Sequence, residues 1–129
     1  MDGEDDRHEA DAAVEALLTA LYDAIDRQDL EAVVALFGPD ARIPDSLESV
    51  TVVGRDQIRA YYLRQFATIQ VGTSLLSTRR LPDGRVEADL HVQLRGASGG
   101  SWGERRVKAT YRIDDGKISE MVVDEAVGI

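Results

Sequence analysis

The chain has no cysteine, only two histidines and only three prolines among its 129 residues. Without cysteine it cannot form a disulfide framework, a thiol nucleophile or a cysteine-based metal site. His8 lies in the N-terminal segment, and His91 shares its strand parity with charged residues on the face of a strand turned away from the core. Neither belongs to a metal-ligand motif, so we expect no metal and no other cofactor.

Long hydrophobic runs are also missing. No window approaches the roughly 18 consecutive apolar residues that a membrane span needs. The acidic N-terminus lacks the apolar core of a secretory signal. We therefore expect a cytoplasmic protein without a membrane partner.

Basic residues are scarce, since 15 Lys and Arg face 24 Asp and Glu, a formal net charge of −9. A surface of this charge repels phosphate backbones, which argues against a nucleic-acid partner. Part of the acidic charge is concentrated in residues 1–10, which we expect to form a disordered tail. Residues 11–129 then form a single domain, long enough to bury a core with an internal pocket.

Helical periodicity dominates the first half of the chain. A stripe of Val14, Leu17, Leu18, Leu21 and Ile25 predicts a helix from about Asp11 to Arg27. A short second helix is predicted after Asp29, a good N-cap, with Phe37 on its apolar face and Gly38-Pro39 as its stop. Brief strands are expected over 41–44 and 50–53, and a third helix from about Arg55 to Ala67.

After Gly72 the period changes to two. Apolar residues from Val86 to Leu94 alternate with polar ones, which is typical of an antiparallel strand with one wet face. The turn at 82–84 makes 73–81 its hairpin partner. Two further strands follow, over about 107–113 and 117–125, joined by Asp114-Asp115-Gly116. Helices followed by antiparallel strands predict an α+β fold.

Several of these stretches also resemble a known family. They are 29–37 (Asp-Leu-Glu-Ala-Val-Val-Ala-Leu-Phe), Asp40-Ala41, 54–62 (Gly-Arg-Asp-Gln-Ile-Arg-Ala-Tyr-Tyr) and the hairpin over 111–118. In this order they resemble the NTF2-like (cystatin-like) superfamily, in its SnoaL-like and ketosteroid isomerase-like branch, over about Val14 to Glu125. The resemblance implies a cone in which a curved antiparallel sheet wraps around three N-terminal helices and leaves an apolar pocket. It also implies a homodimer formed through the sheet.

The resemblance carries individual residues across. Asp45 matches the carboxylate base that moves a proton next to a polarised carbonyl, a task for which desolvation strengthens a carboxylate. Tyr62 matches a pocket tyrosine that supports the oxyanion-binding network. The two positions that match the oxyanion donors are Leu21 and Ala109, which cannot donate. Tyr22 follows Leu21, but one helical step turns it about 100° away.

A second acid stands on the last strand. The parity that turns Met121 and Val123 inward also turns Glu125 toward the pocket, whereas a slip of one residue would bring Asp124 there. Glu125 is therefore our second catalytic candidate beside Asp45. The residues that we expect to bind substrate are Leu21, Ile43, Tyr62, Phe66, Ala109, Met121 and Val123.

Three functions remain open from the sequence. The first is a cofactor-independent isomerase or cyclase that acts on a small hydrophobic, polyketide- or steroid-like molecule by carboxylate-mediated proton transfer. The alternative is a non-catalytic ligand-binding or dimerisation module, which the missing donors at Leu21 and Ala109 favour. The third is an epoxide hydrolase, which needs two inward acids and a neighbouring donor. The role of Trp102, beside a glycine-rich turn, stays open.

Overall fold

The computed structural model describes residues 2–45, 50–96 and 100–125, with side chains described over 12–44, 51–96, 100 and 103–123. In these ranges the chain forms three helices, α1 (Asp2–Asp26), α2 (Leu30–Ala35) and α3 (Arg55–Thr68). It also forms six strands, which are β1 (Phe37–Asp45), β2 (Val50–Val53), β3 (Ile69–Arg80), β4 (Val86–Gly96), β5 (Ser101–Asp114) and β6 (Lys117–Glu125).

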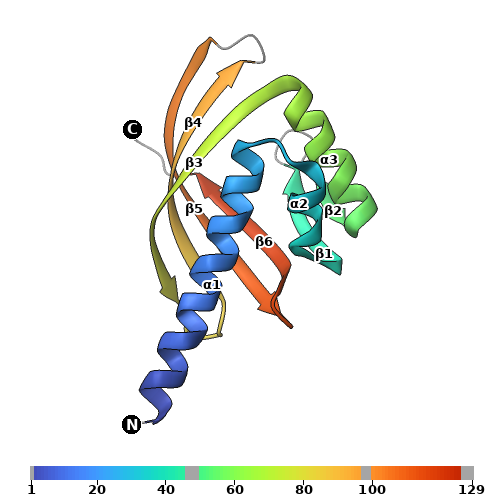
Figure 1. The fold of residues 1–129 in the computed structure, drawn as a ribbon. Coiled ribbons are helices and arrows are strands. Elements are labelled where there is room, and N and C mark those ends of the chain that lie inside the picture. Colours follow the sequence, from blue (N-terminus) through green and yellow to red (C-terminus); the bar gives the residue numbers. More distant parts are fainter. Residues whose placement is uncertain (1, 46–49, 97–99, 126–129) are drawn as a thin grey trace.

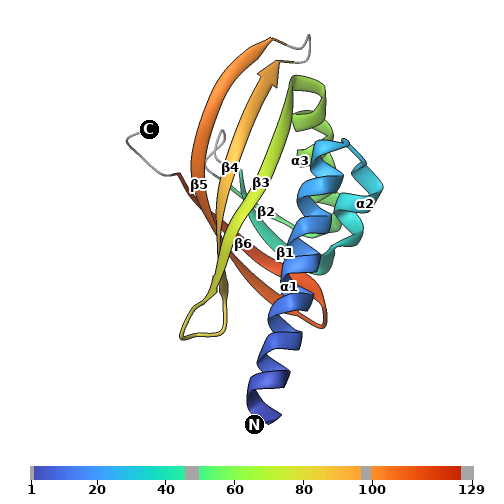
Figure 2. The same cartoon turned by 60° about the vertical axis from the view of Figure 1, so that its left-hand side comes forward.

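The strands form one sheet in the order β2-β1-β6-β5-β4-β3. The β1–β6 pair is parallel and every other pair in this sheet is antiparallel. Figures 1 and 2 show the long strands β3, β4 and β5 bending around α1, while α2 and α3 lie beside it against the other part of the sheet. The predicted α+β cone is confirmed.

The main helix is longer than expected, because helical backbone begins at Asp2 rather than near Asp11. Figures 1 and 2 show the N-terminal half of α1 extending beyond the sheet. The first ten residues include no proline, and acidic residues near a helix N-terminus interact favourably with its dipole, so nothing in this sequence stops the helix at Asp11. The disordered tail over 1–10 and its separation from a domain over 11–129 stay predictions.

The junction between α2 and β1 differs from the expectation for Phe37. Asp29 caps α2 as predicted, since its side chain accepts a hydrogen bond from the backbone nitrogen of Ala32 at 3.2 Å. The helix ends at Ala35, and the backbone nitrogen of Ile118 in β6 donates to the carbonyl of Leu36 at 2.9 Å. That bond draws the chain into the sheet, so Phe37 begins β1 instead of closing the helix, and the strand is longer than the predicted 41–44.

The start of α3 is fixed to β1 by the Gly54-Arg55 pair. Gly54 has φ +88°, a backbone region that favours glycine, and its nitrogen donates to the carbonyl of Ala41 at 2.9 Å. The Arg55 Nε donates to the carbonyl of Phe37 at 2.9 Å. These contacts explain why the predicted start of α3 agrees with the structure.

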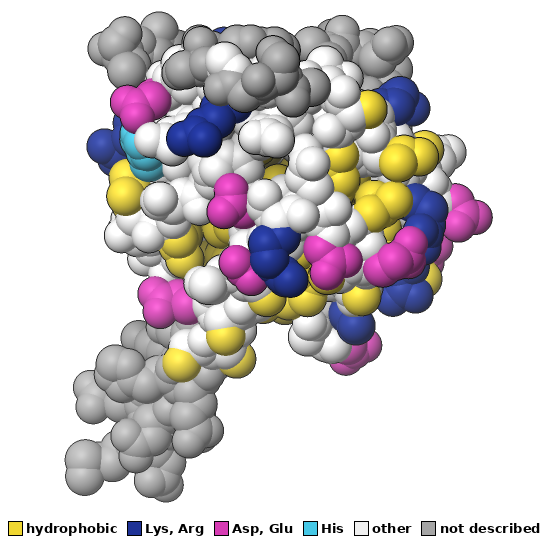
Figure 3. All heavy atoms as spheres, turned by 45° about the horizontal axis from the view of Figure 1, so that its top comes forward, with side chains coloured by type: hydrophobic (Ala, Val, Ile, Leu, Met, Phe, Trp, Pro, Cys, Tyr) yellow, Lys and Arg dark blue, Asp and Glu magenta, His cyan; other side chains and the backbone are white. Residues whose placement is uncertain are grey.

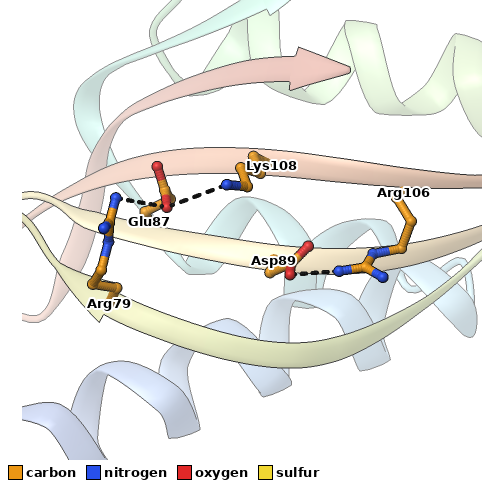
Figure 4. A network of polar contacts seen from close by, with 5 residues as sticks. All are labelled: Arg79, Glu87, Asp89, Arg106 and Lys108. Carbon is orange, nitrogen blue, oxygen red and sulfur yellow. Dashed lines mark hydrogen bonds and ion pairs between the residues drawn. The ribbon is translucent and has the colours of Figure 1, made fainter. Parts of the chain in front are cut away.

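Apolar and polar side chains alternate along β4 and therefore lie on opposite faces of the sheet. Val86, Ala88 and Leu90 are buried on the concave face of β4, as predicted. The opposite face carries ion pairs, shown in Figure 4. There Glu87 lies 3.2 Å from Arg79 and 3.9 Å from Lys108, and Asp89 lies 2.6 Å from Arg106. None of the helices in the described part of the chain is long and apolar enough to cross a membrane.

The core fills the space between the helices and the concave face. The largest side chains that are almost completely buried are Tyr111, Phe37, Leu18, Leu21, Ile43, Ile58, Ile118 and Val33. They come from both ends of the chain, so the N-terminal helices and the C-terminal hairpin bury the same apolar surface. Beside residues 90–94 of β4 and 105–111 of β5 this packing gives way to a cavity.

Candidate functional site

An open cavity of about 570 Å³ lies between α1, α3 and the concave face of the sheet. This volume falls within the range of roughly 300–1,000 Å³ that small-molecule sites occupy. The helical residues that line it are Leu21, Tyr22 and Ile25 from α1, and Tyr61, Tyr62, Arg64, Gln65 and Thr68 from α3. The strand residues are Ile69, Val71, Thr73, Leu90, Val92, Leu94, Arg105, Val107, Ala109, Tyr111, Met121 and Val123.

The lining is mainly apolar and opens toward solvent. Figure 3 turns the top of Figure 1 forward and shows hydrophobic side chains at the surface between charged side chains of both signs. Two arginines, Arg64 and Arg105, belong to the lining and are exposed. The wall is therefore a large hydrophobic surface that includes two exposed arginines.

A pair of tyrosine hydroxyls is the main buried polar feature of this wall. The Tyr22 and Tyr111 hydroxyl oxygens lie 2.6 Å apart, and either can be the donor. The two rings meet edge to face, with centroids 6.5 Å apart. Tyr22 is 6% exposed and Tyr111 is 1% exposed, so the hydrogen bond joins α1 to β5 in an environment with little water.

Tyr62 packs beside this pair within an aromatic group. Its ring centroid lies 5.1 Å from that of Tyr61, 5.9 Å from that of Phe66 and 6.3 Å from that of Phe37. Among the described residues, the Tyr62 hydroxyl has no hydrogen-bond partner. An aromatic group of this kind gives the α3 side of the cavity a rigid apolar surface.

Burial keeps all three phenols in the neutral form. Desolvation raises the pKa of Tyr22 well above its usual value, although the hydrogen bond with Tyr111 acts in the opposite direction. It also raises the pKa values of Tyr62 and Tyr111, and neighbouring tyrosines add to both shifts. These hydroxyls are therefore hydrogen-bond donors over the physiological pH range rather than sources of charge.

Most of the predicted substrate-binding residues are brought together here. The wall includes Leu21, Tyr62, Ala109, Met121 and Val123. Ile43 and Phe66 lie elsewhere: Ile43 is 1% exposed in the core, and Phe66 packs against Tyr62 and is partly buried. Both belong to the packing that supports the cavity rather than to its described wall.

The predicted catalytic side chains lie outside the described side chains. The backbone of Asp45 ends β1 and pairs with Val50, and the backbone of Glu125 ends β6 and pairs with Val107. The side chains of Asp124 and Trp102 are likewise not described. The catalytic roles of Asp45 and Glu125 stay predictions.

Sequence reasoning missed Tyr22 and Tyr111 as residues of the site. The argument that one helical step turns Tyr22 away from the pocket was wrong, because Leu21 and Tyr22 both line the cavity. The sheet bends strongly around α1 (Figure 2). More than one side of the helix therefore faces the sheet, and neighbouring positions such as Leu21 and Tyr22 can both line the cavity. A signal for Tyr111 was present, since it alternates in step with Val107 and Ala109 on β5.

Two smaller hollows are more polar than the main cavity. One, of about 400 Å³, is lined by Asp26, Gln70, Val71, Gly72, Thr73, Ser74, His91, Gln93 and Arg95. The other, of about 210 Å³, lies at the ion pairs of Figure 4. His91 is about one-third exposed, in agreement with its predicted place on the outer face. In the described part of the chain, no group of three His, Cys, Asp or Glu residues could hold a metal ion.

Comparison with protein families resolves the identity of the domain. The model of the SnoaL-like domain matches residues 18–121. The chain belongs to the SnoaL-like family. The match includes α2, α3, most of the sheet and every residue that lines the cavity except Val123. No curated protein matches the chain at a significant level.

Solved structures share the fold of this SnoaL-like domain at low sequence identity. A protein with a ketosteroid isomerase-like fold from Catenulispora acidiphila, in complex with trimethylamine, has a TM-score of 0.74 and 20% identity over 86% of this chain and 85% of its own. A provisionally named polyketide cyclase from Xanthomonas campestris has a TM-score of 0.74 and 19% identity over 87% and 89%. RV0760c from Mycobacterium tuberculosis, in complex with estradiol-17beta-hemisuccinate, has a TM-score of 0.72 and 18% identity over 84% and 90%. At these identities the likeness establishes the fold alone.

Proposed function

We propose that this SnoaL-like protein binds a small hydrophobic molecule of polyketide- or steroid-like size in its cavity and transfers a proton on it with a carboxylate. The observation that carries the proposal is the apolar cavity of about 570 Å³ with a buried pair of hydroxyl groups in its wall. A site of this kind suits a ligand that is mainly apolar and carries few polar atoms. The steroid ester bound by the M. tuberculosis neighbour is a molecule of that class.

The chemistry that we propose is enolisation. The Asp45 carboxylate removes a proton from a carbon next to a ligand carbonyl; the electron pair of the broken C–H bond forms a C=C bond, and the π pair of the carbonyl moves to its oxygen. The proton then returns to the same carbon or to another carbon of the enolate, which gives exchange or isomerisation. No redox partner or cofactor is needed, because no electrons leave the ligand.

Glu125 is the second acid in this proposal, and the strand register supports it over Asp124. Position 125 pairs with Val107, which lines the cavity, whereas position 124 pairs with Lys108 on the opposite face. Residues directly opposite in an antiparallel pair share a face of the sheet. A protonated Glu125 could donate its own proton to a second carbon while Asp45 keeps the proton it removed, and exchange of both carboxyl groups with solvent would then restore the starting state.

Deuterium exchange tests the proposed chemistry without knowledge of the natural substrate. With 2-tetralone in D2O, the wild-type protein should accelerate the exchange of the hydrogens next to the carbonyl, as followed by proton NMR. Asp45→Asn should remove this acceleration and leave the melting temperature nearly unchanged. Asp40→Asn is the matched control, because Asp40 is an exposed aspartate on the same strand. Full acceleration by Asp45→Asn would show that Asp45 is not the base.

A non-catalytic ligand-binding protein is the second candidate. Among the described residues, the wall of the cavity contains no Asp or Glu, and Leu21 and Ala109 stand at the two predicted donor positions. This candidate predicts that 2-tetralone or related ketones bind while exchange remains at the rate of the buffer alone. Any protein-dependent exchange that Asp45→Asn abolishes would contradict it.

The homodimer is proposed on the convex face of the sheet. That face carries the ion pairs of Figure 4 together with Val122, which is 41% exposed. A second copy could pack on Val122 and exchange some of these ion pairs across the interface. Sedimentation velocity should give the mass of a dimer for the wild type and that of a monomer for Val122→Asp, and a monomeric wild type would contradict the proposal. Cytoplasmic location stays a prediction.

A further inference from the structure

Among the described residues, the hydroxyl pair of Tyr22 and Tyr111 leaves one hydrogen without an acceptor. Each phenol carries one hydrogen, and the bond of 2.6 Å between the two oxygens uses only one of them. Among the described residues, neither hydroxyl has a second hydrogen-bond partner. A ligand that displaces water from the cavity leaves this donor unpaired unless the ligand itself accepts the hydrogen, and an unpaired buried donor is costly. The unused hydrogen therefore favours a ligand that carries an acceptor.

The surroundings of the pair restrict what that acceptor can be. The cavity wall that contains the pair is formed mainly by apolar side chains, among them Leu21, Leu90, Val107 and Ala109. Burial keeps both phenols protonated, because their pKa values are raised by desolvation. A neutral donor inside an apolar wall fits a ligand that is apolar except for an oxygen with free lone pairs.

We infer that the Tyr22–Tyr111 pair is a polar recognition point of the cavity and donates a hydrogen bond to a carbonyl oxygen of the ligand. One hydroxyl contacts the ligand, and the other orients and polarises it through the 2.6 Å bond. This inference rests on the proposed function, because it requires that a hydrophobic ligand enters the cavity. Tyr22 and Tyr111 would thus provide the hydrogen-bond donor that Leu21 and Ala109, at the two predicted donor positions, cannot provide.

Matched ligands separate this role from a purely structural one. Fluorenone and fluorene share one tricyclic skeleton and differ in the carbonyl group, and fluorenone has no hydrogen next to its carbonyl, so it reports binding without chemistry. The wild type should bind fluorenone more tightly than fluorene. The infrared carbonyl stretch of bound fluorenone should lie at lower frequency than in an apolar solvent, because a hydrogen bond weakens the C=O bond.

The decisive variant is the double substitution Tyr22→Phe/Tyr111→Phe. It replaces both partners of one hydrogen bond by apolar groups of the same shape, which is the change that a buried pair tolerates best. Fluorenone affinity should fall roughly 3- to 10-fold, the range for one lost hydrogen bond, and the carbonyl frequency should return to its value in an apolar solvent. Fluorene affinity should change by less than about 2-fold.

The single variants then show which hydroxyl contacts the ligand. The variant that removes the contacting hydroxyl should abolish the infrared shift, whereas the other should only reduce it. Equal losses for fluorenone and fluorene in the double variant, or an unshifted carbonyl in the wild type, would overturn the inference while ligand binding itself remained established. If neither ligand binds the wild type, the proposed function fails and the inference fails with it.

Discussion

The hydroxyl oxygens of Tyr22 and Tyr111 lie 2.6 Å apart and connect α1 to β5 at the wall of the cavity. Because each is the partner of the other, their effects on stability should not be additive. Tyr22→Phe and Tyr111→Phe should each lower the free energy of unfolding by about 0.5–1.5 kcal/mol, and the double variant by less than the sum. Urea unfolding of the four proteins measures the coupling. Additive losses would show that the hydrogen bond contributes nothing to the unliganded protein.

Ala88 and Ala109 provide a second comparison, because they are paired across β4 and β5 but differ in surroundings. Both are almost fully buried, and only Ala109 lines the cavity. Ala109→Leu places its added volume in open space, so it should leave stability nearly unchanged and block hydrophobic ligands. Ala88→Leu overpacks the core and should lower the free energy of unfolding by about 1–3 kcal/mol. Thermal unfolding and fluorenone binding measure both effects, and a reversed pattern would mean that the cavity does not bind the ligand.

The fold was largely predictable because its signals are local. The alternation of apolar and polar residues after Val86 predicts β4 and its solvent-exposed face. Asp29 marks the start of α2 as its N-cap, and Gly54 marks the start of α3. The exception at the end of α2 depends on a long-range contact. Phe37 joins the sheet because Ile118, 81 positions away in sequence, bonds to the carbonyl of Leu36.

The site was less predictable than the fold. A helix on a flat sheet buries one stripe, and that assumption placed Leu21 inside and Tyr22 outside. A sheet that bends around α1 buries both, and this curvature cannot be read from α1 alone. The pairing of Tyr22 with Tyr111 joins residues 89 positions apart, which no periodicity within one element reveals.

The N-cap of α2 gives a test of local stability. The Asp29 side chain accepts from the backbone nitrogen of Ala32, so Asp29→Ala should lower the free energy of unfolding by about 1 kcal/mol. Asp29→Asn is the matched control, since asparagine caps a helix about as well as aspartate. Chemical denaturation measures both variants. Equal losses would show that the charge of Asp29, 3.8 Å from Arg27, matters more than the cap.

The buried tyrosines predict a loss of stability in alkali. Burial raises the pKa values of Tyr22, Tyr62 and Tyr111 above 10.0, so the native state keeps their protons where the unfolded chain releases them. Their contribution to stability is therefore complete below about pH 10 and decreases as the pH rises above it. Tyrosinate absorbance should show these phenols ionising only as the protein unfolds. Ionisation of all four tyrosines near pH 10 with the fold intact would contradict this prediction.

The central claim is that the cavity binds a hydrophobic ligand whose carbonyl accepts a hydrogen bond from the tyrosine pair. A crystal structure of the complex with fluorenone tests it most directly. We predict that the rings lie between α1 and the concave face of β4 and β5, with the carbonyl oxygen within about 3 Å of the Tyr22 or Tyr111 hydroxyl. Fluorenone bound instead at the hollow beside His91, or in the cavity with its oxygen turned to solvent, would contradict the account.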